Sequence, residues 1–258
     1  MTEVSRRRFE GRTAIVTGAS SGIGRDVAIA FAREGANVVL AARRTEMLET
    51  VAEEVHAAGS RSLVVPTDVA NGDDVRHLVE KAVAVFGRID AAFNNAGTEG
   101  TMAPIAAQTE SDFIEVVDVN LKGTWLCLKH EMEAMSQSGG GAIVNSSSFL
   151  ARGAVRGSSI YSASKAGLHA MIRSLALEGG PLGIRINNVL PGTVKTPMLD
   201  RVFDEAAATA AAAYTPMKRL GATSDIAGAV LWLCSDDAGF VTGESIAIDG
   251  GFSISGMR

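Results

Sequence analysis

The chain alternates short runs of apolar residues with longer segments in which apolar residues recur every three or four positions. The short runs are rich in valine and isoleucine and have the length of buried strands, whereas the longer segments have the period of helices. This alternation predicts an α/β fold, in which a doubly wound parallel sheet is covered by helices on both faces. Seven runs fit about seven parallel strands, at residues 13–17, 37–41, 62–65, 89–93, 142–145, 184–190 and 245–248.

Two of the helical segments carry boundary signals. The first has one apolar face, and Gly35 is placed to end the helix. That face consists of Ile23, Val27, Ala30 and Phe31. In the second, the segment Thr109-Glu110-Ser111-Asp112 has the form of a capping box and predicts a long helix over residues 109–135. Its expected inner face consists of Phe113, Val117, Asn120, Thr124 and Leu128.

Composition agrees with a globular chain that has a large core. Apolar residues make up 47% and charged residues 21% of the 258 positions, which excludes a disordered protein. The formal net charge is −5 and charges of both signs are mixed along the chain, which removes the electrostatic reason to bind nucleic acid or an anionic membrane. Because no internal repeat or linker interrupts the pattern, we expect one domain over residues 1–258.

The cysteines and the N-terminus bear on the compartment. Cys127 and Cys234 lie far apart in apolar helical segments, and no cysteine and histidine cluster has the spacing of a metal site. They predict free thiols in a reducing compartment. The basic run Arg6-Arg7-Arg8 is followed by Phe9-Glu10-Gly11-Arg12 and not by the apolar stretch of a signal peptide. With no run of about 18 apolar residues either, we expect a cytoplasmic protein without a membrane span or a metal.

A glycine-rich segment, Thr17-Gly18-Ala19-Ser20-Ser21-Gly22-Ile23-Gly24, joins the first predicted strand directly to the first helix. Where side chains are absent, backbone N–H groups and a helix N-terminus can approach a phosphate, so this turn is a candidate cradle for a dinucleotide pyrophosphate. The stretch Gly18-Ala19-Ser20-Ser21-Gly22 also matches the G-x-S-x-G motif of serine hydrolases. The order of elements opposes a hydrolase, because one strand precedes the motif and the last histidine is His169.

The end of the second predicted strand bears on the choice between NAD and NADP. A carboxylate there would bind the ribose 2′-hydroxyl of NAD, whereas arginine would bind the 2′-phosphate of NADP. The chain has Ala41-Ala42 followed by Arg43-Arg44, with no acid. A guanidinium recognises phosphate through a planar fork, so Arg43, assisted by Arg44, predicts a preference for NADP(H) over NAD(H).

Tyr161 and Lys165 are four residues apart and are therefore neighbours on one helical face. An ammonium close to a phenol favours the phenolate and would lower the pKa of tyrosine from about 10 toward the working range of a proton donor and acceptor. Such a pair suits proton transfer to a carbonyl oxygen. Taken alone, it is also compatible with ordinary packing on a helix surface.

Several motifs follow one another along the chain, namely the glycine turn, Asp68, Asn94-Asn95-Ala96-Gly97, Asn120, Ser148, Tyr161-x-x-x-Lys165 and Pro191-Gly192. In this order they resemble the short-chain dehydrogenase/reductase family in its single-domain form, from about residue 10 to residue 252. The resemblance implies a Rossmann-like fold and an NAD(P)-dependent oxidoreductase that interconverts a ketone and a secondary alcohol by hydride transfer. The family also has members that bind cofactor without turnover, but the catalytic Ser, Tyr and Lys are all present here.

The resemblance implies a role for each of these residues. Tyr161 would be the general acid in reduction and the base in oxidation, Lys165 would lower its pKa and bind the nicotinamide ribose, and Ser148 would bind the substrate oxygen. Asn120 would form a backbone kink that holds a water on the proton path to Lys165, and Asn94 would brace the sheet. The residues implied to bind cofactor are Gly18, Ser20, Ser21, Gly22, Ile23, Gly24, Arg43, Arg44, Asp68, Val69, Asn95, Ala96, Gly97, Tyr161, Lys165, Pro191, Gly192, Val194 and Thr196.

The substrate pocket implied by the resemblance has a mostly apolar wall. Such a wall suits ketones or secondary alcohols with hydrophobic substituents, so the expected reaction is carbonyl reduction of a hydrophobic substrate. The expected wall residues are Met102, Phe149, Leu150, Val155, Met198, Val202, Phe203, Tyr214 and Met217, with Glu99, Arg152 and Arg156 as candidate polar groups.

Three further expectations come with the resemblance. A 3-oxoacyl-(acyl-carrier-protein) reductase shares every motif and is the alternative activity. The alanine-rich segment 205–214 falls within a variable substrate lid, about residues 193–220, and is either a closing element or an ordinary surface helix. Relatives are usually homotetramers, which would pack the helices at residues 109–135 and 158–178 between subunits.

Overall fold

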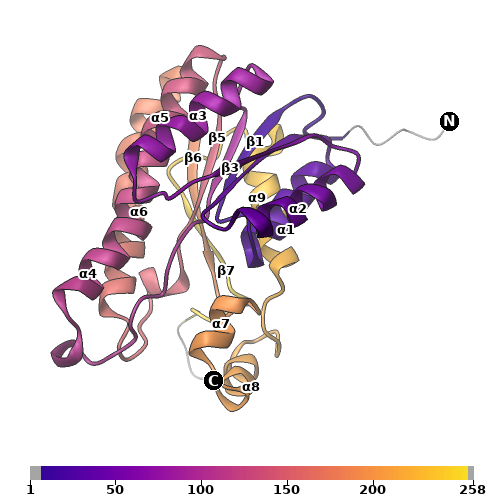
Figure 1. Cartoon of the computed structure of the whole chain (residues 1–258). Coiled ribbons are helices and arrows are strands. Elements are labelled where there is room, and N and C mark those ends of the chain that lie inside the picture. The colour runs from indigo at the N-terminus through magenta and orange to yellow at the C-terminus, as the bar shows by residue number, and fades with distance from the viewer. Residues whose placement is uncertain (1–6, 255–258) are drawn as a thin grey trace.

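The computed structural model describes residues 7–254, so Arg6 of the basic run lies outside the described residues. The strands of this part of the chain are β1 Thr13–Thr17, β2 Asn37–Ala42, β3 Ser62–Pro66, β4 Ala91–Asn94, β5 Gly141–Ser146, β6 Ile184–Pro191 and β7 Ser245–Ile248. They form one parallel sheet in the order β3-β2-β1-β4-β5-β6-β7, which confirms the predicted doubly wound sheet (Figure 1). The strand order reverses at β1, and ligands bind outside the carboxyl ends of the strands at such a point.

Helices cover both faces of the sheet. They are α1 Gly22–Arg33, α2 Thr45–Ala57, α3 Gly72–Phe86, α4 Glu110–Val117, α5 Gly123–Gln137, α6 Ser159–Gly179, α7 Pro197–Val202, α8 Glu205–Tyr214 and α9 Thr223–Cys234, with short 3₁₀ turns at Ile105–Ala107, Phe149–Ala151, Gly180–Leu182 and Asp236–Ala238. α1, α2 and α9 pack on one face, and α3, α5 and α6 pack on the other. In Figure 1, α7 and α8 lie together at one end of the molecule, below the sheet.

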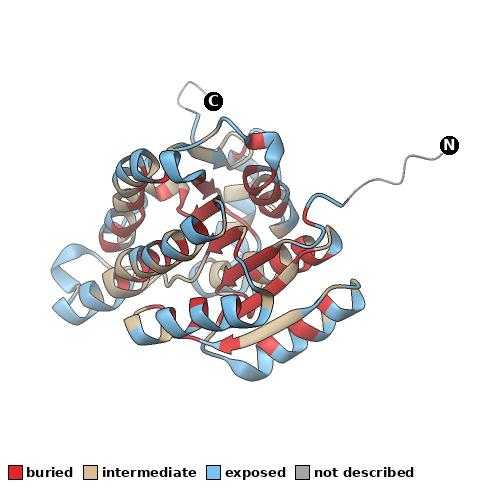
Figure 2. Cartoon of the chain, turned by 90° about the horizontal axis from the view of Figure 1, so that it is seen from above, coloured by how far each residue is buried: buried red, intermediate tan, exposed pale blue. Residues whose placement is uncertain are grey.

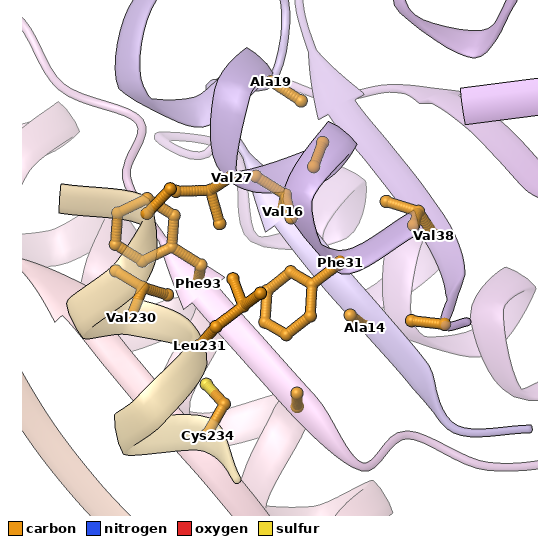
Figure 3. Close-up of a cluster of buried hydrophobic side chains, with 14 of the residues drawn as sticks. Ala14, Val16, Ala19, Val27, Phe31, Val38, Phe93, Val230, Leu231 and Cys234 are labelled. Atoms are coloured by element: carbon orange, nitrogen blue, oxygen red, sulfur yellow. The ribbon is translucent and has the colours of Figure 1, made fainter. Parts of the chain in front are cut away.

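Two apolar clusters fill the space between the helices and the sheet, whose central strands are buried (Figure 2). On the first face, Val27 and Phe31 of α1 pack with Val230 and Leu231 of α9 and with Phe93 of β4 (Figure 3). Val27 and Phe31 are fully buried, which confirms the predicted inner face of α1. The second cluster joins α3, α5 and α6 to the sheet through residues that include Leu78, Leu128 and Ile172.

The predicted long helix over residues 109–135 is interrupted. Its capping box is confirmed, because the Thr109 side chain accepts a hydrogen bond from the Asp112 backbone and the Asp112 carboxylate accepts one from the Thr109 N–H. However, Asp118–Lys122 forms a π-helical segment between α4 and α5. A π turn accommodates an extra residue and rotates the preceding turn relative to the following one. The expected position of Phe113 on the inner face is therefore wrong, and its side chain is 51% exposed.

Three further properties of the fold concern its cysteines, its helices in relation to a membrane, and groups of metal-binding side chains. Cys127 and Cys234 are both buried free thiols, and burial raises the pKa of Cys234 to about 12. No helix within residues 7–254 has the combined length and apolar character that crossing a bilayer requires. Within the same residues, no group of three or more His, Cys, Asp or Glu side chains is placed to hold a metal ion.

Candidate active site

A cleft of about 810 Å³ opens along the carboxyl ends of the strands, at the switch point of the sheet. It brings together residues from the glycine turn, from the ends of β2, β3, β4, β5 and β6, from the N-terminal part of α6 and from α7. Gly24 and Asn120 are the two residues of the expected cofactor and catalytic sets that do not line it, and both lie behind its wall. The expected residues that line the cleft are Gly18, Ser20, Ser21, Gly22, Ile23, Arg43, Arg44, Asp68, Val69, Asn95, Ala96, Gly97, Ser148, Tyr161, Lys165, Pro191, Gly192, Val194 and Thr196.

The glycine turn packs so closely that side chains are excluded. Gly18 and Gly22 have positive φ angles of 65° and 57°, which L-residues rarely adopt. A Cβ on Gly24 would lie 2.3 Å from the Gly18 carbonyl oxygen, so the third glycine lets the helix start against the turn. Asn95 holds the turn from β4, since its Nδ2 donates to the carbonyl oxygens of Thr17 and Gly18. The result is a bare cradle at a helix N-terminus, which fits a pyrophosphate.

The end of β2 presents guanidinium groups to the cleft. Nη2 of Arg44 donates to the hydroxyl oxygens of Ser20 (2.8 Å) and Ser21 (3.1 Å), so it is anchored to the glycine turn. Arg43 lines the cleft, and its guanidinium forms no hydrogen bond or ion pair with the residues that the structure describes. Ala41 and Ala42 occupy the strand end, where an NAD-binding chain would carry a carboxylate. The donors therefore fit an anionic group at this end of the cleft.

The hydrolase alternative finds no catalytic partner here. The Ser20 hydroxyl is bonded to Arg44. The two hydrogen bonds made by histidine rings in the described chain lie elsewhere, between His56 and Ser62 and between His169 and Ser147. A nucleophilic serine requires a neighbouring base, so the glycine turn lacks the arrangement for acyl transfer.

Ser148, Tyr161 and Lys165 meet at the centre of the cleft. Ser148 follows β5, while Tyr161 and Lys165 lie one turn apart on α6, and the Tyr161 side chain is hydrogen-bonded to Ser148. The Lys165 ammonium donates to the Ser146 carbonyl oxygen at 2.8 Å and lies 5.8 Å from the centroid of the Tyr161 ring. A phenol thus lies beside a hydroxyl, with an ammonium near the phenol ring, an arrangement that suits proton transfer to a carbonyl oxygen.

The pKa expected for Tyr161 from the sequence is wrong for the protein without cofactor. Burial raises the pKa of Tyr161 to about 12, the Ser148 hydrogen bond opposes this shift, and the Glu99 carboxylate adds to it. Burial also lowers the pKa of Lys165 to about 8. Both shifts favour the form of each group that carries less charge, because a low-dielectric site penalises ions. Desolvation, which a sequence does not show, is the largest influence on this pKa, and the Lys165 ammonium is not among the groups that shift it.

Asn120 lies behind Gly97 in the π-helical segment. Its side chain is fully buried and pairs twice with the Thr98 backbone, accepting from the N–H at 2.8 Å and donating to the carbonyl oxygen at 2.9 Å. A Cβ on Gly97 would lie 3.1 Å from the Asn120 side-chain oxygen and 3.4 Å from the Lys165 nitrogen. Gly97 therefore lets these two polar groups approach the same point, and the kink at Asn120 is a π turn.

The substrate end of the cleft is mainly apolar, but the expected wall needs correction. Tyr214 does not line the cleft; its ring packs against Phe252 at 4.9 Å, and Phe252 packs against the wall residue Phe149 at 5.0 Å. Met217 lines a separate cavity of about 330 Å³. Arg152 also lies outside the wall and donates to the Ser245 carbonyl oxygen. Expected wall residues that do line the cleft are Met102, Phe149, Leu150, Val155, Met198, Val202 and Phe203, with Glu99 and Arg156 as polar groups.

Sequence reasoning missed an ion pair that ties α7 to the body of the protein. Arg201 of α7 donates two hydrogen bonds to the Glu99 carboxylate, at 2.6 and 3.1 Å, and both residues line the cleft. Desolvation, the largest single influence, would raise the pKa of Glu99, but the hydrogen bonds from Arg201, a backbone hydrogen bond and the charge of Arg201 together lower it. Residues 102 positions apart leave no local signal of such a pair.

A buried polar row beneath the cleft was also missed, except for Asn94. Asn94, Asn145, Asn188 and Ser245 are register partners on β4, β5, β6 and β7, and their side chains are hydrogen-bonded in sequence. Asn94 also donates to Glu131 of α5. A polar residue near the end of several apolar strands was the available signal, because buried amides need partners.

Comparison with known proteins gives the family. A family model described as Enoyl-(Acyl carrier protein) reductase matches residues 18–253. A short chain dehydrogenase/reductase of Aspergillus oryzae is 41% identical over 251 residues, 95% of this chain and 96% of that one. A cyclohexanol dehydrogenase of an Acinetobacter species is 35% identical over 98% of this chain and 99% of that one. The crystal structure of levodione reductase matches with a TM-score of 0.94 and 35% identity, over 96% of this chain and 100% of that one.

The fold, the cleft and these matches define a class of protein, the Rossmann-fold oxidoreductases that interconvert alcohol and carbonyl groups with NAD(P). Within that class, the chain belongs to the short-chain dehydrogenase/reductase family.

The raised pKa of Tyr161 can be measured directly, because the chain has only two tyrosines. Tyr214→Phe leaves Tyr161 as the single source of tyrosinate absorbance. Since burial disfavours the phenolate, we expect ionisation in the cofactor-free variant only near pH 12, well above the ordinary value of 10.0. The measurement is an ultraviolet pH titration with circular dichroism as the check on folding. Ionisation of the folded variant at or below pH 10 would contradict the described burial.

Proposed function

We propose that the protein is an NADPH-dependent carbonyl reductase of hydrophobic ketones. The observation that carries the cofactor choice is the Arg43 guanidinium, which has no partner within residues 7–254 and lies beside Ala41 and Ala42, where the cofactor ribose is discriminated. The observation that carries the reaction is the meeting of Ser148 and Tyr161 beside an apolar wall. The protonated state of Tyr161 supports reduction, because reduction requires a proton donor.

The residues divide the chemistry as follows. NADPH, when bound, supplies a hydride from C4 of its nicotinamide ring to the carbonyl carbon. The Ser148 hydroxyl hydrogen-bonds the carbonyl oxygen and holds it beside Tyr161. The Tyr161 hydroxyl then donates its proton to that oxygen. Lys165, with its pKa lowered to about 8, is mostly protonated at pH 7, and its ammonium stabilises the phenolate that remains.

Several residues bind the cofactor or position other residues of the site and take no part in the reaction itself. The glycine turn and the α1 N-terminus bind the pyrophosphate, Arg43 binds the 2′-phosphate, and Arg44 keeps Ser20 and Ser21 in place. The remaining expected contacts stay part of the proposal. Asp68 and Val69 contact the adenine, Asn95 and Ala96 bind the cofactor, and Gly97 lets the cofactor approach. Lys165 also binds the nicotinamide ribose, and Pro191, Gly192, Val194 and Thr196 lie along the nicotinamide.

The apolar wall supports a substrate without many polar groups. A relative named for cyclohexanol, a cyclic secondary alcohol, supports a substrate of similar chemistry. The alternative, an acyl chain on a carrier protein, would require a basic docking surface beside the cleft. Of the arginines that line the substrate end, Arg201 is neutralised by Glu99, which leaves Arg156.

The proposal extends to the lid and the assembly. Residues 193–220 form the substrate lid, in which α8 has no buried residue and the Glu99–Arg201 pair secures α7. Residues 1–258 form one cofactor-binding and catalytic domain in a cytoplasmic homotetramer. Large exposed apolar residues on the helices expected between subunits support this assembly, and they are Phe113, Ile114, Trp125 and Leu177.

Tyr161→Phe tests the proton donor. The variant retains the ring and removes the hydroxyl, so we expect NADPH affinity within about twofold of wild type and a loss of at least about 10²-fold in turnover of a hydrophobic ketone. Stopped-flow and steady-state assays measure the rate, and nicotinamide fluorescence measures binding. Tyr214→Phe is the matched control, because that ring lies outside the cleft. An unchanged rate would remove Tyr161 from the mechanism.

Arg43→Ala tests the 2′-phosphate site. Charge-assisted hydrogen bonds contribute about 1.5–3 kcal/mol, so we expect NADPH affinity to fall about 10- to 100-fold while NADH affinity changes little. Arg44→Ala is the matched control, because loss of its bonds to Ser20 and Ser21 disturbs a part of the site that both cofactors share. Equal losses for the two cofactors in Arg43→Ala would refute this role of Arg43.

A further inference from the structure

Glu131 is a buried acid that the proposed reaction does not use. It lies on α5 with no exposed surface, and one of its oxygens, Oε2, accepts a hydrogen bond from Asn94 Nδ2 at 2.8 Å. Its other oxygen, Oε1, is buried and has no hydrogen-bond partner within residues 7–254. The side-chain oxygen of Asn94 is likewise buried and has no donor in this part of the chain. Two joined side chains therefore each carry one orphaned acceptor.

The orientation of the Asn94 amide is set by the polar row. Asn188 donates to Ser245, Asn145 donates to Asn188, and Asn94 donates to Asn145 at 3.1 Å. Because each amide nitrogen in the row points the same way, Asn94 must use its Nδ2 as donor toward β5. Rotating the Asn94 amide would instead place its oxygen against the side-chain oxygen of Asn145, two acceptors with no proton between them.

We propose that Glu131 is protonated in the folded protein and donates from Oε1 to the Asn94 side-chain oxygen, closing a ring of two hydrogen bonds between the acid and the amide. A single proton thus satisfies both orphaned atoms, whereas an ionised Glu131 leaves both unsatisfied. The uncharged Glu131 side chain then ends the hydrogen-bonded row that runs from Asn94 on β4 to Ser245 on β7.

Among residues 7–254, no cation contributes to the pKa of Glu131, which depends on burial and on the hydrogen bond from Asn94. Apart from the asparagine row, the second apolar cluster lies on this face of the sheet and includes Leu78, Val79, Ala82, Ala92, Ile143 and Ile186. The ionisable groups whose pKa responds to Glu131 are the thiols of Cys127 on α5 and Cys234 on α9, and burial raises both pKa values, so they are neutral as well. Burial raises the pKa of Glu131 from 4.5 to about 7.

The row also positions the cofactor turn, a consequence that rests on the proposed function. Asn94 precedes Asn95, which holds the glycine turn through Thr17 and Gly18. Asn145 precedes Ser146, whose carbonyl oxygen accepts from Lys165. Glu131 is thus a positioning residue, which acts on the site through Asn94 without contacting the cleft.

The pH dependence of unfolding tests the proton on Glu131. The folded protein keeps a proton that the unfolded chain loses above pH 4.5, so unfolding releases that proton and stability falls as pH rises toward about 7. Glu131→Gln reproduces both hydrogen bonds and cannot ionise. We expect equal stability of wild type and variant near pH 4.5, and a wild-type unfolding constant that rises relative to the variant by about tenfold per pH unit up to about pH 7.

The measurement is denaturant unfolding of the full chain without cofactor at pH 4.5 to 8.5. Glu133→Gln, an exposed change on the same helix, is the matched control and should show no such divergence. Infrared spectroscopy should show a protonated carboxyl band that Glu131→Gln removes. A difference between wild type and Glu131→Gln that does not vary with pH would overturn the proposal.

The positioning role has its own readout. Glu131→Leu removes both bonds, and we expect NADPH affinity to fall about tenfold while Glu131→Gln retains it. Equal affinity in the two variants would overturn the positioning role. A protein that fails to bind NADPH at all would refute the proposed function. The protonation of Glu131 would still be tested, because the unfolding measurement needs no cofactor.

Discussion

The register of the parallel sheet is the constraint on which the site depends. Asn94, Asn145 and Asn188 face one another on adjacent strands, and a buried amide is stable only where it is hydrogen-bonded. A slip of one residue in any strand would turn its asparagine to the other face of the sheet and break the row. The residue after each of the first two asparagines reaches the cleft, so the same register fixes where these next residues lie. They are Asn95, which holds the glycine turn, and Ser146, whose carbonyl oxygen accepts from Lys165.

Burial of Tyr161 and Lys165 sets the protonation states of the reactive groups in the cleft. Burial keeps the Tyr161 phenol protonated and brings the pKa of Lys165 close to neutral, so the resting site holds a proton donor beside an ammonium. The Glu99 carboxylate, which adds to the raised pKa of Tyr161, forms an ion pair with Arg201. At the other end of the cleft, the cationic Arg43 and Arg44 and the bare glycine turn at the N-terminus of α1 suit an anion. The two ends therefore suit a phosphorylated cofactor and an uncharged substrate.

Features with a local sequence signal were predictable. Strand runs, the α1 face, the capping box at Thr109 and the glycine turn each depend on residues within a few positions of one another, and the structure has all of them. The features that could not be predicted depend on contacts between residues that are far apart in the sequence. The π segment at Asp118–Lys122 occurs where the side chain of Asn120 is hydrogen-bonded to the Thr98 backbone. Arg201 and Glu99 pair across segments far apart in the chain. The Tyr214 ring packs against Phe252 and does not line the cleft. The pKa of Tyr161 depends on burial by the whole fold.

The most direct test of the account is a parallel titration of the wild-type protein with NADPH and with NADH, followed by the fluorescence of the reduced nicotinamide. The account predicts binding of NADPH at least about tenfold tighter than NADH, since only NADPH offers a phosphate to Arg43. Equal or tighter binding of NADH would contradict the assignment of the 2′-phosphate site, and binding of neither cofactor would contradict the assignment of the cleft itself.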